Sequence, residues 1–133
     1  SNEMWRATVD ILDFIPLANV DYGGGVIITD WYNESNQNDS IKIMVQFLSN
    51  EIRADGLKII VYDRTCNTAN LINCSTSVDD NNSIGQELKL AILRKAAEMK
   101  LNTSDEKAKE YKKKTKGLIT GPDAGEGEGA AKD

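Results

Sequence analysis

The chain has 133 residues, 40% of them hydrophobic, and a formal net charge of −5. A chain of this length fits one domain with a core of its own. Residues 1–102 hold 14 acidic and 9 basic residues, whereas residues 103–133 hold 7 of each, so the excess negative charge belongs to the first part. Like-charge repulsion therefore argues against nucleic acid and anionic lipid as partners. No apolar run approaches the ~20 residues that a membrane-spanning helix needs.

The first predicted element is a helix over residues 4–14. The side chains expected on its buried face recur at helical spacing and are Trp5, Thr8, Val9 and Leu12. Pro16 ends the helix, because a proline cannot donate the backbone hydrogen bond that a helix requires. The residues that follow, 15–21, have an extended pattern and predict a short strand.

Three glycines at positions 23–25 lead directly into the β-branched run of residues 26–32. A phosphate-binding loop would place such glycines before a helix, with a lysine behind them, whereas here they precede a strand and no lysine follows. The glycines therefore predict a hairpin turn. Alternation along the strand would set two groups on opposite faces: Ile27, Thr29 and Trp31 on one, and Val26, Ile28, Asp30 and Tyr32 on the other.

Three further strands are predicted after the polar loop of residues 33–40. Residues 41–48 alternate clearly, with Ile41, Ile43, Val45 and Phe47 on the expected core face. Residues 57–63 show the same kind of alternation and predict another strand. Residues 71–78 are predicted to form a strand that pairs with it. Short links between strands require antiparallel pairing, because a parallel return needs a long crossover.

A second helix is predicted to begin near Ser83, where Ser83 and Gln86 form a capping box. Its expected buried stripe is Ile84, Leu88, Ala91, Ile92, the stem of Lys95 and Met99, widened by Leu90, Leu93 and Ala97. Two helices from opposite ends of the chain can cover one face of the sheet. The predicted fold is α+β: a two-layer, helix-grip-like domain over residues 3–102 with an N-terminal helix, a four- to five-stranded antiparallel sheet and a C-terminal helix.

The pattern changes after this domain. Residues 103–116 are charged and could extend the second helix, and the lysines within them, at 112–114 and 116, are interpreted as a solvated surface. Residues 117–133 are rich in glycine, alanine and acidic residues. They have almost nothing to bury and are predicted to be a disordered tail.

The residue types argue against catalysis. The chain has no histidine, which removes Ser–His and Cys–His nucleophilic schemes and the usual zinc sites. Its carboxylates are scattered, so we expect no catalytic residue, no metal and no cofactor. Cys66 and Cys74 lack metal-ligand spacing; they could form a hairpin disulfide in an oxidising compartment or stay thiols in the cytosol.

Candidate binding residues gather in two stretches. The first holds Gly24 and Gly25 in the turn, followed by Asp30, Trp31 and Tyr32, where one strand end could present acidic and aromatic groups together. Trp31 is interpreted first as a core anchor and second as a ligand-stacking residue. In the second stretch, Arg53 and Asp55 are expected mainly to hold a turn between two strands.

The segment WRATVDILDFIPLANVDYGGGVIITDWY, residues 5–32, resembles the opening of an uncharacterised alphaproteobacterial lipoprotein family, the domain of unknown function 3576. The later EIRADGLKIIVY, residues 51–62, and the second amphipathic helix are also similar to that family, so the likeness spans residues 4–101. The resemblance implies export, an N-terminal lipid-anchored cysteine that this chain lacks, and a periplasmic domain. It transfers no catalytic residue.

The sequence therefore indicates two candidate functions. The first is a non-catalytic periplasmic domain of an envelope lipoprotein that binds or scaffolds other envelope components. It would act as a monomer, partnered by envelope proteins and held at a membrane only through an N-terminal lipid anchor. The alternative is a small-ligand binding module that uses a cavity between the long helix and the sheet.

Overall fold

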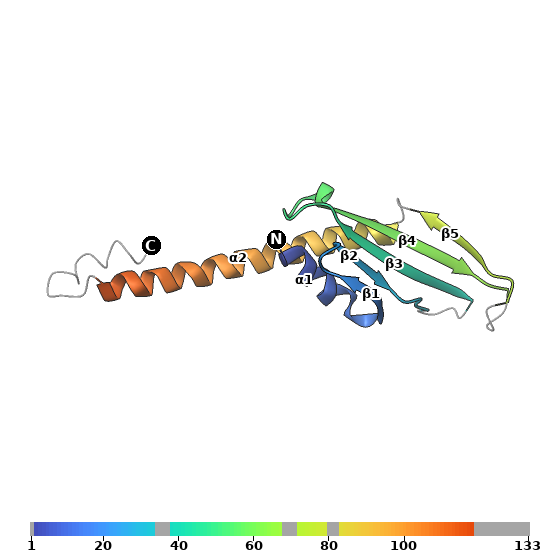
Figure 1. Ribbon diagram of the computed structural model, residues 1–133, viewed down its shortest axis with the longest axis horizontal. Helices are drawn as coiled ribbons and strands as arrows, with labels where there is room; N and C mark the ends of the chain where they lie inside the picture. The colour runs from blue at the N-terminus through green and yellow to red at the C-terminus, as the bar shows by residue number, and fades with distance from the viewer. Residues whose placement is uncertain (1, 34–37, 68–71, 80–82, 119–133) are drawn as a thin grey trace. The chain divides into compact units, whose positions relative to one another are not determined.

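The computed structural model describes residues 2–33, 38–67, 72–79 and 83–118 (Figure 1). The chain divides into two compact units, the first being Ser1–Ala97 and the second beginning at Glu98. The long C-terminal helix, α2 (Ser83–Leu118), belongs to both units and includes the predicted extension at 103–116. The predicted disordered tail, residues 117–133, begins too early, because α2 continues through residues 117 and 118. The rest of that tail lies outside the described residues, as does part of the loop at 33–40.

A five-stranded antiparallel sheet forms the centre of the first unit, as predicted. Its strands are β1 (Leu17–Asp21), β2 (Val26–Thr29), β3 (Asp39–Phe47), β4 (Leu57–Thr65) and β5 (Ser75–Asp79). Their order in the sheet is their order in the chain, and every neighbouring pair is antiparallel. A short 3-10 helix, η2 (Ala54–Gly56), lies in the connection between β3 and β4.

The N-terminal helix is shorter than predicted and buries a different face. Helix α1 (Asn2–Ile11) is followed by a 3-10 turn, η1 (Leu12–Phe14). Leu12 and Thr8 are buried as expected, but Val9 is 37% exposed, and Met4 and Ala7 are fully covered instead. Positions 4, 7, 8 and 12 lie on a narrower face of a helix than a set that includes position 9, and this narrower face is the one that α1 buries.

Helix α2 begins at Ser83, as predicted, and its first turns pack on β4. A Cβ atom added to Gly85 would lie 3.5 Å from a Val61 methyl and 3.7 Å from an Ile59 methyl. The first turn of α2 therefore packs closely against β4. The buried residues of the first turns are Gly85, Ile92 and Ala96. Ile84 and Leu90, which were expected on the stripe, are 38% and 57% exposed. The stripe is rotated because the glycine allows a close approach that a larger side chain would prevent.

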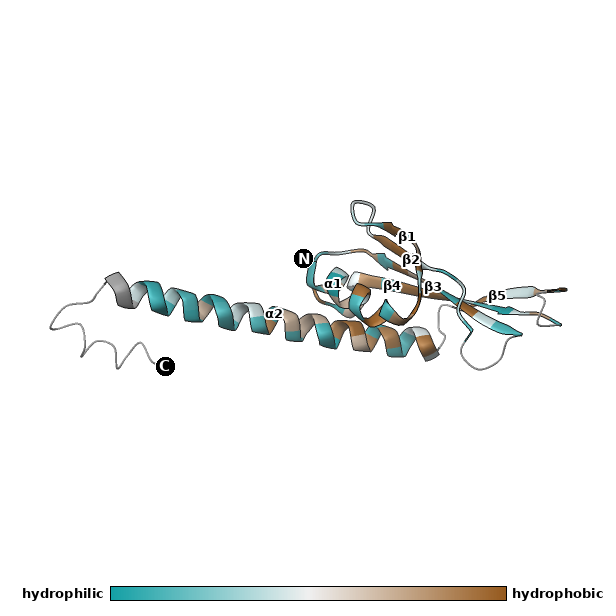
Figure 2. Cartoon of the chain, turned by 90° about the horizontal axis from the view of Figure 1, so that it is seen from below, coloured by the Kyte–Doolittle hydropathy of each residue, from teal (hydrophilic) through white to brown (hydrophobic). Residues whose placement is uncertain are grey.

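The two-layer arrangement is confirmed. Figure 2 shows α1 and the first turns of α2 on one face of the sheet. An ion pair between Asp10 of α1 and Lys95 of α2 joins the two helices. The alternate residues of the strands that face the helices form the core, among them Ile27, Ile43, Val45, Leu57, Ile59 and Val61. The opposite face of the sheet carries no described helix.

A bulge after β2 overturns the predicted faces of its last residues. The Ile43 amide donates to Thr29 Oγ1, whereas Ile41 pairs with Tyr32 through two backbone hydrogen bonds of 2.8 and 2.9 Å. Two residues, Asp30 and Trp31, therefore oppose the single residue between Ile41 and Ile43. Such an insertion reverses the side-chain alternation that follows it.

Tyr32 consequently lies on the helix side of the sheet, where its ring meets Phe14 edge-on with centroids 5.3 Å apart. Trp31 lies on the opposite face, beside Lys42 and Arg64. The interpretation of Trp31 as a core anchor is therefore wrong. The alternation was assumed to run unbroken through residue 32, and the extra residue breaks it.

Candidate functional site: an aromatic cleft at the β1–β2 turn

A cleft of about 320 Å³ opens where α1, the β1–β2 turn and the end of β3 meet. Its aromatic wall is made by Trp5 of α1, Tyr22 of the turn and Phe47 of β3. The remaining lining residues are Gly23, Gly24, Gly25, Leu48, Ser49 and Asn50. These three segments are brought together because the turn follows the edge strand β1 while α1 crosses the same end of the sheet.

The three rings form one cluster around the half-buried Trp5. The Trp5 and Tyr22 rings meet edge-on, with centroids 4.9 Å apart and planes at 84°. Trp5 and Phe47 have centroids 5.3 Å apart, with planes at 41°. Tyr22 is 63% exposed and so offers its ring to solvent. Aromatic pairs at such distances hold one another in fixed orientations, so the wall is preorganised.

The glycine turn is tied to the neighbouring strand by backbone hydrogen bonds. The Gly24 amide donates to Asp21 Oδ1 at 2.9 Å, and the Phe47 amide donates to the Gly25 carbonyl at 2.8 Å. Gly25 has φ of +70°, and a Cβ placed there would lie 3.1 Å from the Phe47 carbonyl oxygen. Glycine is needed at this position both for its conformation and for the close approach of β3.

The cleft offers aromatic surface and neutral hydrogen-bonding groups. No charged side chain is among its lining residues, and its polar groups are a hydroxyl at Ser49, an amide at Asn50 and the phenol of Tyr22. Rings beside neutral polar groups recognise ligands by stacking and by hydrogen bonds.

The structure separates the candidate residues predicted from sequence. Gly24 and Gly25 line the cleft, and the loop that holds Arg53 and Asp55 follows the cleft residue Asn50. Arg53 is held within that loop, because its Nε donates to Asp55 Oδ1 at 2.8 Å and its Nη1 to Glu51 Oε2 at 2.9 Å. All three side chains are more than half exposed. The contacts are those of residues that hold a turn.

Asp30, Trp31 and Tyr32 lie at the opposite end of β2 from the glycine turn. Asp30 is exposed, and its Oδ1 accepts from the Trp31 amide at 2.9 Å. These residues do not join the cleft, and the bulge sends their aromatic rings to two different faces.

Sequence reasoning missed the aromatic wall. Periodicity places Trp5 and Phe47 in the core, whereas in the structure both lie at its border. Tyr22 is predicted only as the first residue of the hairpin turn, with no binding role. Its position directly before three glycines was the available signal, because a turn exposes the side chain that enters it.

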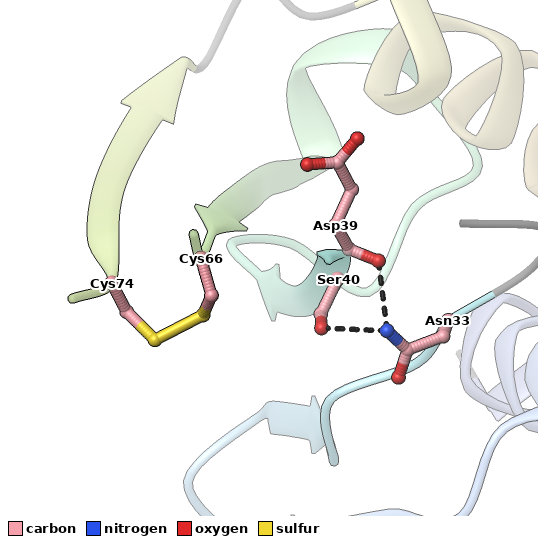
Figure 3. The surroundings of a disulfide bond; sticks show 5 residues. All are labelled: Asn33, Asp39, Ser40, Cys66 and Cys74. Atoms are coloured by element: carbon pink, nitrogen blue, oxygen red, sulfur yellow. Dashed lines mark hydrogen bonds between the residues drawn. A yellow bond between two sulfur atoms is a disulfide. The ribbon is translucent and has the colours of Figure 1, made fainter. Parts of the chain in front are cut away.

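A second feature lies at the far end of β4, where a disulfide joins Cys66 and Cys74 and closes the β4–β5 hairpin (Figure 3). Cys66 is 3% exposed, and its amide donates to the Asn38 carbonyl at 2.9 Å. Nearby, the Asn33 side-chain amide donates to the Asp39 carbonyl and to the buried Ser40 hydroxyl, at 2.9 and 3.1 Å. These contacts join the ends of β3 and β4 to the segment after β2.

Among the described residues, no group of three or more Cys, Asp or Glu side chains is placed to hold a metal ion. In the same part of the chain, none of the helices combines the length and apolar character needed to cross a bilayer.

Comparison with known proteins gives a family but no activity. The sequence model of a family described as a domain of unknown function, DUF3576, matches residues 1–101. An uncharacterized protein of Rickettsia prowazekii (strain Madrid E) is 38% identical over 102 residues, which is 75% of this chain. The match covers 58% of that relative's length. No solved structure matches the chain.

Proposed function

The chain belongs to the DUF3576 family of domains of unknown function, and from that premise we propose that it is a non-catalytic periplasmic domain of an envelope lipoprotein that binds other envelope components. The observation that carries the binding role is the aromatic cleft, a preorganised wall of three rings with uncharged lining residues. The cleft would hold an uncharged part of its partner by stacking on Tyr22 and by hydrogen bonds to Ser49 and Asn50.

The disulfide supports the proposed compartment. Disulfides persist in oxidising environments such as the bacterial periplasm and are rare in the reducing cytosol. A bond between Cys66 and Cys74 fits an exported domain. The membrane attachment in this proposal is a lipidated cysteine upstream of Ser1.

Binding is tested by capture from a detergent extract of the cell envelope on the immobilised chain. Tyr22→Ala should lose the captured component, whereas Tyr111→Ala, which removes a similarly exposed ring from α2, should retain it. Equal capture by folded Tyr22→Ala protein would contradict the proposed role of the cleft. The compartment is tested separately, by mass spectrometry of the mature N-terminus of the native protein, which should carry a diacylated cysteine.

A second candidate is a small-ligand binding module. A pocket of about 490 Å³ lies between β4 and the first turns of α2, with Leu57, Ile59, Gly85 and Gln86 in its wall. This is the helix–sheet position that the alternative function requires. Methyl NMR of Ile59 during titration with a panel of small apolar acids and alcohols tests it, and saturable shifts would favour this candidate over envelope binding.

A further inference from the structure

The sheet face opposite the helices carries an apolar row where polar residues are the rule. Ile28 pairs with Met44, and Met44 pairs with Ile60, so three half-buried apolar side chains lie side by side across β2, β3 and β4. An antiparallel sheet with one face on the core normally exposes polar residues on the other. Figure 2 shows no described element over this face. The row is therefore an apolar surface on the outside of the domain.

Basic residues flank the row on both sides. On one side Lys58 pairs with Gln46, and on the other Lys42 pairs with Tyr62. Two places further along β4 is Arg64, on the same face. The described acidic residues of β3 and β4, Asp39 and Asp63, fall on the opposite parity and face the other way. Asp21 of the edge strand β1 pairs with Val26 and lies on the open face, where its Oδ1 accepts from the Gly24 amide. Along β1–β4 the face thus carries three cations and one carboxylate, so it is locally positive on a chain whose net charge is −5.

Trp31 joins the two basic residues at one end of the face. The Arg64 guanidinium carbon lies 4.2 Å from the centroid of the Trp31 ring, and Lys42 Nζ lies 5.6 Å from it. Neither cation forms an ion pair with a described carboxylate. Arg64 Nε is buried and has no hydrogen-bond partner among the described residues. The stacking fixes the guanidinium in place and leaves its charge uncompensated within the described part of the chain.

We propose that this open sheet face docks a protein partner whose surface presents carboxylates around an apolar strip. The inference deepens the proposed function, because it gives the class of one envelope component that the domain would bind. Tryptophan, tyrosine, arginine and methionine are the residue types enriched at the centre of protein interfaces. Trp31, Tyr62, Arg64 and Met44 supply all four on one face, and the basic residues select a partner of acidic surface.

Two other occupants fit less well. In a symmetric dimer through this face, the three cations of each copy, Lys42, Lys58 and Arg64, would meet with a single carboxylate from β1–β4 of each copy, Asp21, to balance them. An anionic bilayer would meet the local positive charge, but it would also meet the net negative charge of residues 1–102 at long range. A protein needs complementarity only over the docked face.

The test places the photo-crosslinking residue p-benzoylphenylalanine at Met44 or at Ile60 of the full chain in cells. Control positions are Val20, which is 50% exposed and paired with the core-facing Ile27, and Tyr111 on α2. Both open-face positions should give the same protein adduct and the controls should not. Mass spectrometry of the crosslinked peptide should identify a partner segment rich in Asp and Glu.

Charge variants test the basic residues. Lys42→Glu with Lys58→Glu should lower the adduct yield about tenfold or more, because close charge pairs across an interface are reversed. Lys107→Glu with Lys109→Glu makes the same change on α2 and should leave the yield unchanged. Both variants retain Arg64, so the stacked pair with Trp31 and the fold are preserved.

A phospholipid adduct, an adduct with a second copy of the chain, a partner segment without carboxylates, or no adduct would each overturn the proposal. So would a yield that the charge reversals do not lower. The Tyr22→Ala variant distinguishes binding through the cleft from docking on the open face. It should abolish capture through the cleft and leave the open-face adduct unchanged.

Discussion

The guanidinium of Arg64 lies over the indole of Trp31, with its central carbon 4.2 Å from the ring centroid. The two residues come from different strands, and they meet only because a bulge at Asp30 and Trp31 turns the tryptophan to the outer face. A cation over a tryptophan ring is attracted by the electron density of the ring face. The contact holds together the end of the sheet that we propose as a docking surface.

A double-mutant cycle with Trp31→Leu and Arg64→Met should give a coupling free energy of about 0.5–1 kcal/mol in urea unfolding, the usual size of a cation–π contact near the surface. Lys42→Met in the same cycle is the control. Its ammonium is 5.6 Å from the ring centroid, so its coupling should be smaller. A Lys42 coupling equal to or larger than that of Arg64 would show that the stacking is not specific.

Reduction of the disulfide should lower the free energy of unfolding by about 2.5 kcal/mol, the loop-closure value for so short a loop. The bond joins residues separated by 8 positions. Urea unfolding of the wild-type chain with and without dithiothreitol measures the difference, and the double variant Cys66→Ser, Cys74→Ser controls for direct effects of the reductant. Identical unfolding midpoints would mean that the hairpin does not need the bond.

Two isoleucines on opposite faces of the sheet should differ sharply in their contribution to stability. Ile43→Ala removes a fully buried side chain and should cost about 2–5 kcal/mol. Ile60→Ala removes the same atoms from the half-buried open face and should cost less than about half as much, because water already reaches that face. Equal losses in chemical denaturation would indicate that something covers the open face.

The sequence predicts the order of the elements because the periodicities are long and clear. The strands with Ile41 to Phe47 and Leu57 to Asp63 alternate over several residues, and Ser83 marks the start of α2. The local irregularities could not be predicted. The bulge that moves Trp31 depends on how β2 pairs with β3, and the register between strands is not encoded in the alternation of either strand alone.

The sequence predicts the glycine turn of the candidate site but not the aromatic side chains that form its wall. The glycines at 24 and 25 were expected to form a turn, and they do. The wall of the cleft needs Trp5 and Phe47 from distant parts of the chain, and both belong to periodic patterns that favour a core position. A ring at the border of the core can pack against the core on one side and line the cleft on the other. Only the three-dimensional arrangement shows which side of the ring is open.

Gly25→Ala should lower stability by about 1–2 kcal/mol, the cost of a left-handed backbone for a residue with a Cβ. The Phe47 carbonyl oxygen, 3.1 Å from the added carbon, would also have to move, which would disturb the cleft. Gly23→Ala is the matched control, because its nearest neighbour is an Asp21 oxygen at 3.8 Å. Thermal unfolding of the two variants measures the difference, and an equally destabilised Gly23→Ala would argue against a special role for position 25.

The central claim is that the domain binds an envelope component through the aromatic cleft. Fluorine NMR of the chain labelled with 5-fluorotryptophan tests it most directly, because the two tryptophans report on separate surfaces: Trp5 on the cleft and Trp31 on the open sheet face. The Trp31→Phe variant assigns the two signals. On addition of fractionated envelope extract, we expect a saturable shift of the Trp5 signal that Tyr22→Ala abolishes. A Trp5 signal that no fraction changes would contradict the account.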